Sequence, residues 1–342
     1  MRTFATIALV AFTISGCGLF SAPTAPTGPF TQIVVFGDSL SDAGNIHAAF
    51  SIVPQAPYFD GRLSNGPVWV ERLASRYGLV ARPSFRGGTN FAHAASGTGR
   101  GLGQSFGLPL GPNVRQQVDL YHGQPAGTEL FVVWGGANDV FDVLGDDCND
   151  PPTTIADNVF LAVARLYELG GRWFLVPNLP DIGLTPRYRD TPRQERATQL
   201  SNDVNAALGA RLDQLETLPD IRIWRMDIAA LFAEMIASPP PGLTNTTDPA
   251  WTGGFLGYAG GEGQLAENPD AYLFWDDVHP TRVSHQVLAE RAIDLLQASL
   301  PTAAPPPPPA GFAFNILPPE TEFWLMYFSL ASQPERGDAC RF

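Results

Sequence analysis

Short apolar runs alternate with amphipathic segments along most of this chain. Four short runs rich in apolar residues have the length of buried strands, at 33–36, 130–134, 173–176 and 221–224. Helical spacing of hydrophobic residues marks 67–77, 114–121, 153–169, 194–215, 228–236 and 283–298. Strands separated by helices of this length form parallel sheets with right-handed crossovers. The pattern therefore predicts an α/β fold, a three-layer sandwich in which helices cover both faces of a central, mostly parallel sheet.

Two regions fall outside this alternation. Residues 238–268 are rich in Gly, Pro and Thr and show little periodicity, which predicts a long irregular loop that forms a wall of a binding site. The proline run at 305–309 marks the end of the folded domain, placed at 30–300, and the segment 301–342 is predicted to be a spacer and a tail of unknown role. Docking of this tail onto the domain and disorder are both open.

The amino-terminal segment has the pattern of an export signal. Arg2 precedes an apolar run over 4–14, which is too short to span a bilayer as a mature helix. The motif Ile14 to Cys17 resembles the lipobox of bacterial lipoproteins, which implies a signal peptide over 1–16, a lipidated Cys17 and a tether over 17–29. The protein is then expected in the bacterial cell envelope as an outer-membrane lipoprotein. Ordinary cleavage near Ala22 with secretion is the alternative, disfavoured by the proline that follows.

Composition narrows the range of partners. The 342 residues carry a net charge of −13 with only 21 Lys and Arg, so a nucleic-acid partner is not expected. The three cysteines, Cys17, Cys148 and Cys340, are too few for a disulfide scaffold or a zinc site. Cys148 and Cys340 are free to pair once Cys17 is lipidated, because an exported protein meets an oxidising environment. The oligomeric state stays open.

The clearest candidate for chemistry is Ser39. The apolar run at 33–36 stops at Gly37, Asp38 and Ser39, as where a buried strand delivers a side chain to its carboxyl end. A serine hydroxyl needs a base, an orienting carboxylate and an oxyanion site to act as a nucleophile. The plain alternative is a tight turn built from Gly, Asp and Ser.

His279 is the best partner for Ser39. Asp276 lies three residues before it, close enough for the carboxylate to accept one imidazole N–H and leave the other nitrogen free as a base. Asp277 competes with Asp276 for this role. A solvated acidic turn with an incidental histidine is the alternative.

Other glycine-rich and strand-end motifs offer donors for an oxyanion. Asn138 follows the strand at 130–134 as Ser39 follows the first strand, and its amide can donate to a developing charge. The segment 87–92 is a second candidate, because glycine lets backbone N–H groups approach a substrate closely. Ser105 matches the nucleophile-elbow motif formally but lacks the strand and helix around it.

Taken together, these motifs resemble the GDSL branch of the SGNH hydrolases. The four blocks lie at 37–45, 88–92, 135–139 and 276–281, and the likeness covers about 31–300. The resemblance implies a flavodoxin-like fold, with Ser39 as nucleophile, His279 as base, Asp276 as its orienter, and the N–H groups of Ser39 and Gly88 with Asn138 as oxyanion donors. Many relatives have a glycine pair after the second block, where this chain has Ala94 and Ala95, so those residues compete with Gly88.

The sequence thus predicts an exported serine hydrolase that cleaves carboxylic esters through an acyl-enzyme, with no metal or cofactor. A small-molecule or lipid ester is the expected substrate, and the membrane is reached through the lipid at Cys17. The alternative within the same chemistry is a phospholipase or lipid acyltransferase. An alternative of another class is a surface binding protein on a degenerate hydrolase fold, which a fluorophosphonate probe would not label.

Overall fold

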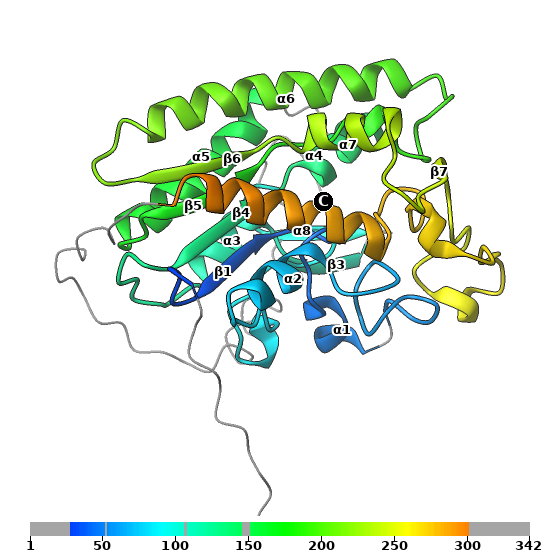
Figure 1. Cartoon of the computed structure of the whole chain (residues 1–342), viewed down its shortest axis with the longest axis horizontal. Helices are drawn as coiled ribbons and strands as arrows, with labels where there is room; N and C mark the ends of the chain where they lie inside the picture. The colour runs from blue at the N-terminus through cyan, green and yellow to red at the C-terminus, as the bar shows by residue number, and fades with distance from the viewer. Residues whose placement is uncertain (1–27, 52, 106–107, 146–150, 301–342) are drawn as a thin grey trace, which may run out of the picture.

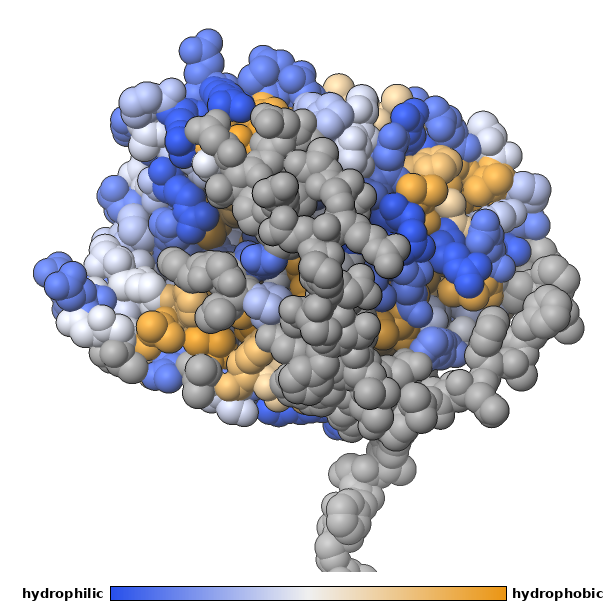
Figure 2. Space-filling view, turned by 180° about the vertical axis from the view of Figure 1, so that it is seen from behind, coloured by the Kyte–Doolittle hydropathy of each residue, from blue (hydrophilic) through white to orange (hydrophobic). Residues whose placement is uncertain are grey.

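The computed structural model describes residues 28–51, 53–105, 108–145 and 151–300. The predicted signal peptide, the tether up to residue 27, all three cysteines and the tail over 301–342 lie outside the described residues. Within the described ranges, no helix combines the length and apolar character needed to cross a bilayer. On the face shown in Figure 2, hydrophilic residues are interspersed with several hydrophobic patches.

A parallel sheet of four strands forms the centre of the molecule (Figure 1). Its strands lie in the order β1 (Ile33–Gly37), β4 (Leu130–Trp134), β5 (Trp173–Pro177) and β6 (Arg222–Met226), each parallel to its neighbour. Residues 89–93 run along the free edge of β1, where the N–H of Val35 donates to the Thr89 carbonyl at 2.9 Å and that of His93 to the Gly37 carbonyl at 3.1 Å. Residues 89–93 thus pair with one edge of β1, and β4 pairs with the other. Ligand sites in such sheets form at the carboxyl end of the strand where the chain changes from one side to the other, which here is β1.

Helices cover both faces of this sheet. One face packs against α2 (Trp69–Arg76), α7 (Ile228–Ala237) and α8 (Arg282–Ala298), and the other against α3 (Val114–Asp119), α5 (Pro152–Glu168) and α6 (Gln194–Leu215). Successive strand residues alternate between the two cores: Val35 and Val132 face the first set of helices, Val34 and Phe131 the second. Every residue of β1, β4 and β5 is buried. The predicted three-layer α/β fold is confirmed.

Several short elements were not predicted. They are α1 (Asn45–Phe50), α4 (Ala137–Gly145), the hairpin of β2 (Leu102–Ser105) and β3 (Leu108–Pro112), the pair β7 (Asn245–Pro249) and β8 (Tyr272–Phe274), and the 3₁₀ turns at Ser84–Arg86, Ile182–Leu184, Gly257–Gly260 and Pro269–Ala271. Helix α4 begins inside the Gly-Gly-Ala-Asn stretch that resembles a turn in sequence. Ser105 ends strand β2, so the prediction that no strand precedes it is wrong, but the next element is β3 and not the helix that a nucleophile elbow requires.

Candidate active site

Ser39 lies at the carboxyl end of β1, directly after the buried strand. Gly37 ends the strand against the carbonyl of Trp134, where a Cβ atom would come within 2.5 Å of the oxygen, so glycine is needed there. The chain then turns on Asp38, whose main-chain oxygen accepts the N–H of Ser41 at 3.0 Å. This turn leaves the N–H of Ser39 without an acceptor among the described residues, and Ser39 lines a cavity.

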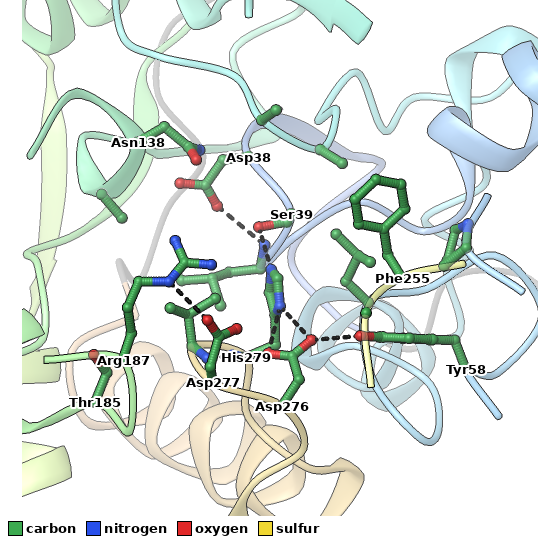
Figure 3. Close-up of a pocket in the computed structure, with 18 of the residues that line it drawn as sticks. Asp38, Ser39, Tyr58, Asn138, Thr185, Arg187, Phe255, Asp276, Asp277 and His279 are labelled. Atoms are coloured by element: carbon green, nitrogen blue, oxygen red, sulfur yellow. Dashed lines mark hydrogen bonds and ion pairs between the residues drawn. The ribbon is translucent and has the colours of Figure 1, made fainter. Parts of the chain in front are cut away.

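The hydroxyl of Ser39 contacts His279, and His279 contacts Asp276 (Figure 3). Ser39 Oγ and His279 Nε2 are 2.9 Å apart, and His279 Nδ1 lies 2.9 and 2.8 Å from the two carboxylate oxygens of Asp276. Because a carboxylate only accepts, Nδ1 carries the proton, and Nε2 is left to accept from the serine hydroxyl. The structure therefore joins Ser39 in one hydrogen-bonded chain to His279, 240 residues away in the sequence, and to its neighbour Asp276.

Charge and burial act in opposite directions on this pair. Burial acts to lower the pKa of His279, but the adjacent carboxylate of Asp276 outweighs it and holds that pKa above its ordinary 6.5. Burial likewise acts to raise the pKa of Asp276, and the charge and hydrogen bonds of His279 lower it below its ordinary 3.8. Asp276 is therefore ionised near neutral pH, and His279 is a stronger base than an exposed histidine.

A tight turn after β8 fixes both residues. The N–H groups of Val278 and His279 donate to Asp276 Oδ1 at 3.0 and 2.8 Å. The N–H of Trp275 donates to the His279 carbonyl at 2.6 Å, which closes the turn. As the three-residue spacing predicts, the carboxylate of Asp276 contacts the imidazole of His279 within one turn.

Asp277, the competing carboxylate, pairs with Arg187 instead. Arg187 Nε donates to Asp277 Oδ2 at 2.8 Å, and its backbone N–H donates to the Asp277 carbonyl at 2.9 Å. The side chain of Asp277 is 51% exposed, whereas that of Asp276 is 7% exposed. Asp277 therefore ties the turn to the loop after β5, and Asp276 is the carboxylate that contacts the histidine.

Asn138 lies in the first turn of α4 and lines the same cavity as Ser39. Its Nδ2 gives one hydrogen to the carbonyl of Ser96 at 2.9 Å. A side-chain amide has two N–H donors, so the second is available to a ligand. The structure thus places Asn138 beside the serine, as its position after β4 predicts.

Ala95 offers the cavity a second backbone donor besides the N–H of Ser39. Its φ is 62°, in the left-handed region that costs a residue with a Cβ about 1–3 kcal/mol. The N–H of Ala94 is already taken by Asp42 Oδ2 at 3.0 Å, whereas that of Ala95 has no acceptor among the described residues. Strain in a residue that lines a cavity beside Ser39 points to a constraint imposed by the site.

Gly88 does not lie at the site, and its prediction as an oxyanion donor is wrong. Its N–H donates to the carbonyl of Pro83 at 2.9 Å, and Gly88 is not among the residues that line the cavity. The register explains the error, because Asn90 pairs with Val35 in the middle of β1. Gly88 therefore lies beside the start of the strand, and Ala95 lies beyond its end.

Asp38 adds a buried carboxyl to the cavity wall. Its side chain accepts the N–H of Leu40 at 3.0 Å. Burial, partly offset by this hydrogen bond and by the charge of His279, raises the pKa of Asp38 to about 7. Near neutral pH the carboxyl is thus partly protonated, which limits the negative charge beside a developing oxyanion.

The cavity around Ser39 has a volume of about 640 Å³ and two chemically different ends. One end is apolar and belongs to a hydrophobic cluster that includes Ile46, Val53, Ala94, Leu110 and Phe255. At the other end, on the opposite side of His279 from Phe255, lie Thr185, Arg187 and Asp277 (Figure 3). Residues 249 and 251–255 line this cavity, so the loop predicted as a wall of the site is one.

Sequence reasoning missed Tyr58 and Arg187 as lining residues. Both come from irregular loops without periodicity, and their contacts with Asp276 and Asp277 span 218 and 90 residues. The described residues contain no group of three His, Cys, Asp or Glu side chains that could hold a metal ion.

Comparison with known proteins gives consistent matches. The family model described as GDSL-like lipase/acylhydrolase matches residues 33–292. A phosphatidylcholine-sterol acyltransferase of Aeromonas hydrophila is 28% identical over 310 residues, which cover 79% of this chain and 91% of that protein. A GDSL esterase/lipase of Arabidopsis thaliana is 26% identical over 319 residues, 78% of this chain and 82% of that protein. Among solved structures, the carbohydrate acetylesterase Est24 of Sinorhizobium meliloti matches with a TM-score of 0.43 and 14% identity, over 78% of this chain and 98% of that one.

Proposed function

The chain belongs to the GDSL-like lipase/acylhydrolase family and is a carboxylic ester hydrolase, and we propose that Ser39, His279 and Asp276 carry out its reaction. The observation that supports this assignment is the chain of hydrogen bonds from Ser39 Oγ through His279 to Asp276 at the floor of the cavity. Asp276 accepts the Nδ1–H of His279, and Nε2 faces the serine hydroxyl whose proton it would take.

The reaction proceeds in two steps through an acyl-enzyme. Ser39 Oγ attacks the ester carbonyl carbon while His279 Nε2 takes the hydroxyl proton, and Asp276 stabilises the imidazolium that forms. When the tetrahedral intermediate collapses, the bond to the alcohol breaks and His279 gives its proton to the leaving oxygen. A water molecule then attacks the acyl-Ser39 ester by the same path, which releases the acid and restores the serine.

The oxyanion is held by three donors from three segments. We assign them to the N–H of Ser39, the N–H of Ala95 and the free Nδ2 hydrogen of Asn138, because all three line the cavity and none has an acceptor there among the described residues. Preorganised donors of this kind are each worth roughly two to three powers of ten in rate. Ala95 replaces Gly88 in this set.

The test is hydrolysis of short-chain chromogenic esters by the wild type and by Ser39→Ala. The variant is expected to lose turnover to background while keeping its melting temperature, because the hydroxyl is the only group removed. Wild-type turnover by the variant would contradict the proposal. If a fluorophosphonate does not label the wild-type protein, the result would instead support the alternative of a binding protein without a reactive serine.

A second candidate is cleavage of phospholipids, with water or another alcohol as acyl acceptor. The cavity favours it because an apolar end suited to an acyl chain lies opposite the guanidinium of Arg187, whose Nη groups have no acceptor among the described residues. A guanidinium binds phosphate oxygens in a bidentate manner. Product analysis with a phosphatidylcholine, with and without a sterol, separates the outcomes: free fatty acid alone indicates a phospholipase, and a sterol ester indicates an acyltransferase.

We further propose that the protein is exported and lipidated at Cys17, which rests on the sequence of the first 17 residues alone. Growth with an alkyne-tagged fatty acid in a bacterial host should label the wild type and leave Cys17→Ser unlabelled. The labelled protein is expected in the envelope fraction. An unlabelled mature chain that begins near residue 23 would instead support simple secretion.

A further inference from the structure

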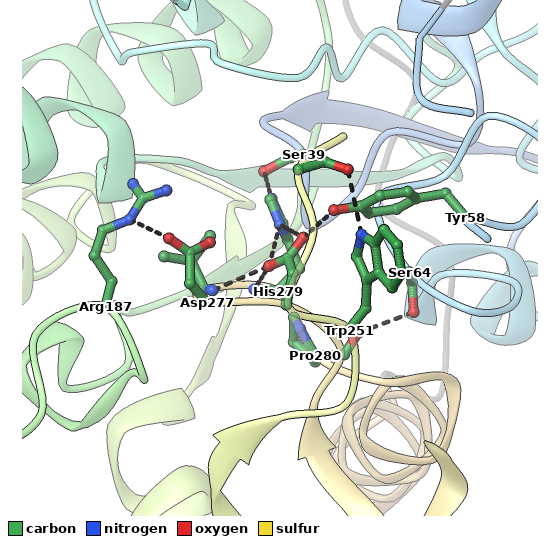
Figure 4. Close-up of polar contacts among 11 residues, drawn as sticks. Ser39, Tyr58, Ser64, Arg187, Trp251, Asp277, His279 and Pro280 are labelled. Atoms are coloured by element: carbon green, nitrogen blue, oxygen red, sulfur yellow. Dashed lines mark hydrogen bonds and ion pairs between the residues drawn. The ribbon is translucent and has the colours of Figure 1, made fainter. Parts of the chain in front are cut away.

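A tyrosine hydroxyl contacts the carboxylate of Asp276 from the side opposite to His279. Tyr58 Oη donates to Asp276 Oδ2 at 2.8 Å (Figures 3 and 4). Tyr58 is 7% exposed and Asp276 is 5% exposed, so this hydrogen bond is shielded from solvent. The chain of hydrogen bonds that begins at Ser39 thus continues one residue beyond the carboxylate.

The ring of Tyr58 is fixed by packing. It meets the ring of Trp275 edge to face, with the centroids 5.7 Å apart and the planes at 83°, and it shares a buried cluster with Ala250 and Trp251. Its backbone N–H donates to the carbonyl of Gln55 at 3.0 Å. The hydroxyl therefore has a fixed direction toward Asp276.

Hydrogen bonds join the segment that contains Tyr58 to the residues that follow His279. Ser64 Oγ donates to the carbonyl of Pro280 at 2.9 Å (Figure 4). The N–H of Arg282 donates to Asn65 Oδ1 at 2.7 Å. Contacts on both sides of His279 thus hold the turn against residues 58–65.

The donors to Asp276 divide between its two oxygens. Oδ1 accepts the N–H groups of Val278 and His279, which belong to the same turn. Oδ2 accepts from Tyr58, and His279 Nδ1 lies within hydrogen-bond distance of both oxygens, 2.9 Å from Oδ1 and 2.8 Å from Oδ2. Among the described residues, Tyr58 is therefore the donor to Asp276 from outside the turn, in a position to fix the rotation of the carboxylate plane against the imidazole.

We propose that Tyr58 is a positioning residue for the hydrolysis reaction: its hydroxyl orients the Asp276 carboxylate toward His279 and stabilises its ionised form. The inference rests on the proposed roles of Ser39, His279 and Asp276. Tyr58 would be the fourth side chain in the hydrogen-bonded chain that begins at Ser39, and its segment contains none of the four motifs of the family resemblance.

Tyr58 itself does not titrate in the working range. Burial, followed by the negative charge of Asp276, raises the pKa of Tyr58 well above its ordinary 10.0, so its hydroxyl remains a donor. The other charged or titratable groups that act on His279 are Asp38 after β1, Asp277 in the turn, Arg187 from the loop after β5 and His285 on α8. A phenylalanine at position 58 leaves all of these in place.

The experiment is the pH profile of kcat/KM for Tyr58→Phe. Loss of the donor makes Asp276 more basic and strengthens its hold on the histidine proton, so the acid limb should move up by about half a pH unit or more. The value of kcat/KM should fall about 10- to 100-fold. Tyr77→Phe is the matched control, because the hydroxyl of Tyr77 is also buried but has no hydrogen-bond partner in the described structure.

Two further measurements keep the outcomes distinct. Fluorotyrosine at position 58 keeps the shape of the ring and donates more strongly, so the acid limb should move down. In an Asp276→Asn background, Tyr58→Phe should cause little further loss. An acid limb that stays at the wild-type pH in both position-58 variants would overturn the inference, whereas a wild type that is inactive and unlabelled at Ser39 would overturn the proposed function.

Discussion

Two adjacent aspartates with opposite surroundings allow a sharp test of the site. Asp276 contacts His279, and Asp277 pairs with Arg187 at the cavity rim. The same substitution, Asp to Asn, removes one negative charge in each case and barely changes the size of the side chain. Any difference between the two variants therefore reports the partner of each carboxylate.

The expected magnitudes follow from geometry and exposure. Asp276 Oδ2 and His279 Nδ1 are 2.8 Å apart, which puts the centres of charge about 4 Å apart. At an effective dielectric constant of about 20, the attraction on the imidazolium is about 4 kcal/mol, or about three powers of ten in rate. Asn also favours the wrong imidazole tautomer, which adds to the loss. The Asp277 pair is about half exposed, and such pairs contribute only about 0–1 kcal/mol.

The assay is kcat/KM on a short-chain chromogenic ester at pH 8, with a thermal melt of each variant. Asp276→Asn should lose about 1,000-fold or more, and Asp277→Asn less than about tenfold. Both variants should remain folded. A larger loss in Asp277→Asn than in Asp276→Asn would refute the assignment of the orienting carboxylate.

Three further predictions concern the donors and the base. Asn138→Ala should lower kcat by about 100- to 1,000-fold with little change in KM, because its donor acts on the oxyanion; an unchanged kcat would remove it from the site. Because Asp276 raises the pKa of His279, the histidine takes up its proton at a higher pH than usual, so kcat/KM should decline as the pH falls through a value above 6.5. A limb centred below 6.5 would contradict this. Ala95→Gly should retain activity and raise the free energy of unfolding by about 1 kcal/mol in denaturant melts, since relief of the positive φ exceeds the added chain entropy; destabilisation would mean that Ala95 is not strained.

The parts of the site that depend on local sequence could be predicted. Ser39 follows a buried strand, and Asp276 and His279 share one turn, so strand ends and a three-residue spacing were enough to select them as candidates. The residues next to Asp276 and Asp277 in the sequence do not show which of the two carboxylates contacts His279. That depends on Arg187, which reaches the turn from 90 residues away.

The parts that depend on register and on irregular loops could not be predicted. Gly88 was a candidate oxyanion donor because glycine lets its backbone N–H approach a substrate closely. The pairing of Asn90 with Val35, however, places Gly88 beside the start of β1, away from Ser39. The donor that we propose in its place is Ala95, whose left-handed backbone is not evident from an alanine in sequence. Tyr58 lies in a segment without periodicity, and its contact with Asp276 exists only in the folded chain.

The most direct test of the account is labelling of the wild-type protein with a fluorophosphonate, followed by peptide mapping. The account predicts that one peptide carries the phosphonate, that the modified residue is Ser39, and that His279→Ala greatly slows the labelling. Modification of Ser105 or another serine, or no labelling of an enzyme that hydrolyses esters, would contradict the central claim that Ser39 is the nucleophile.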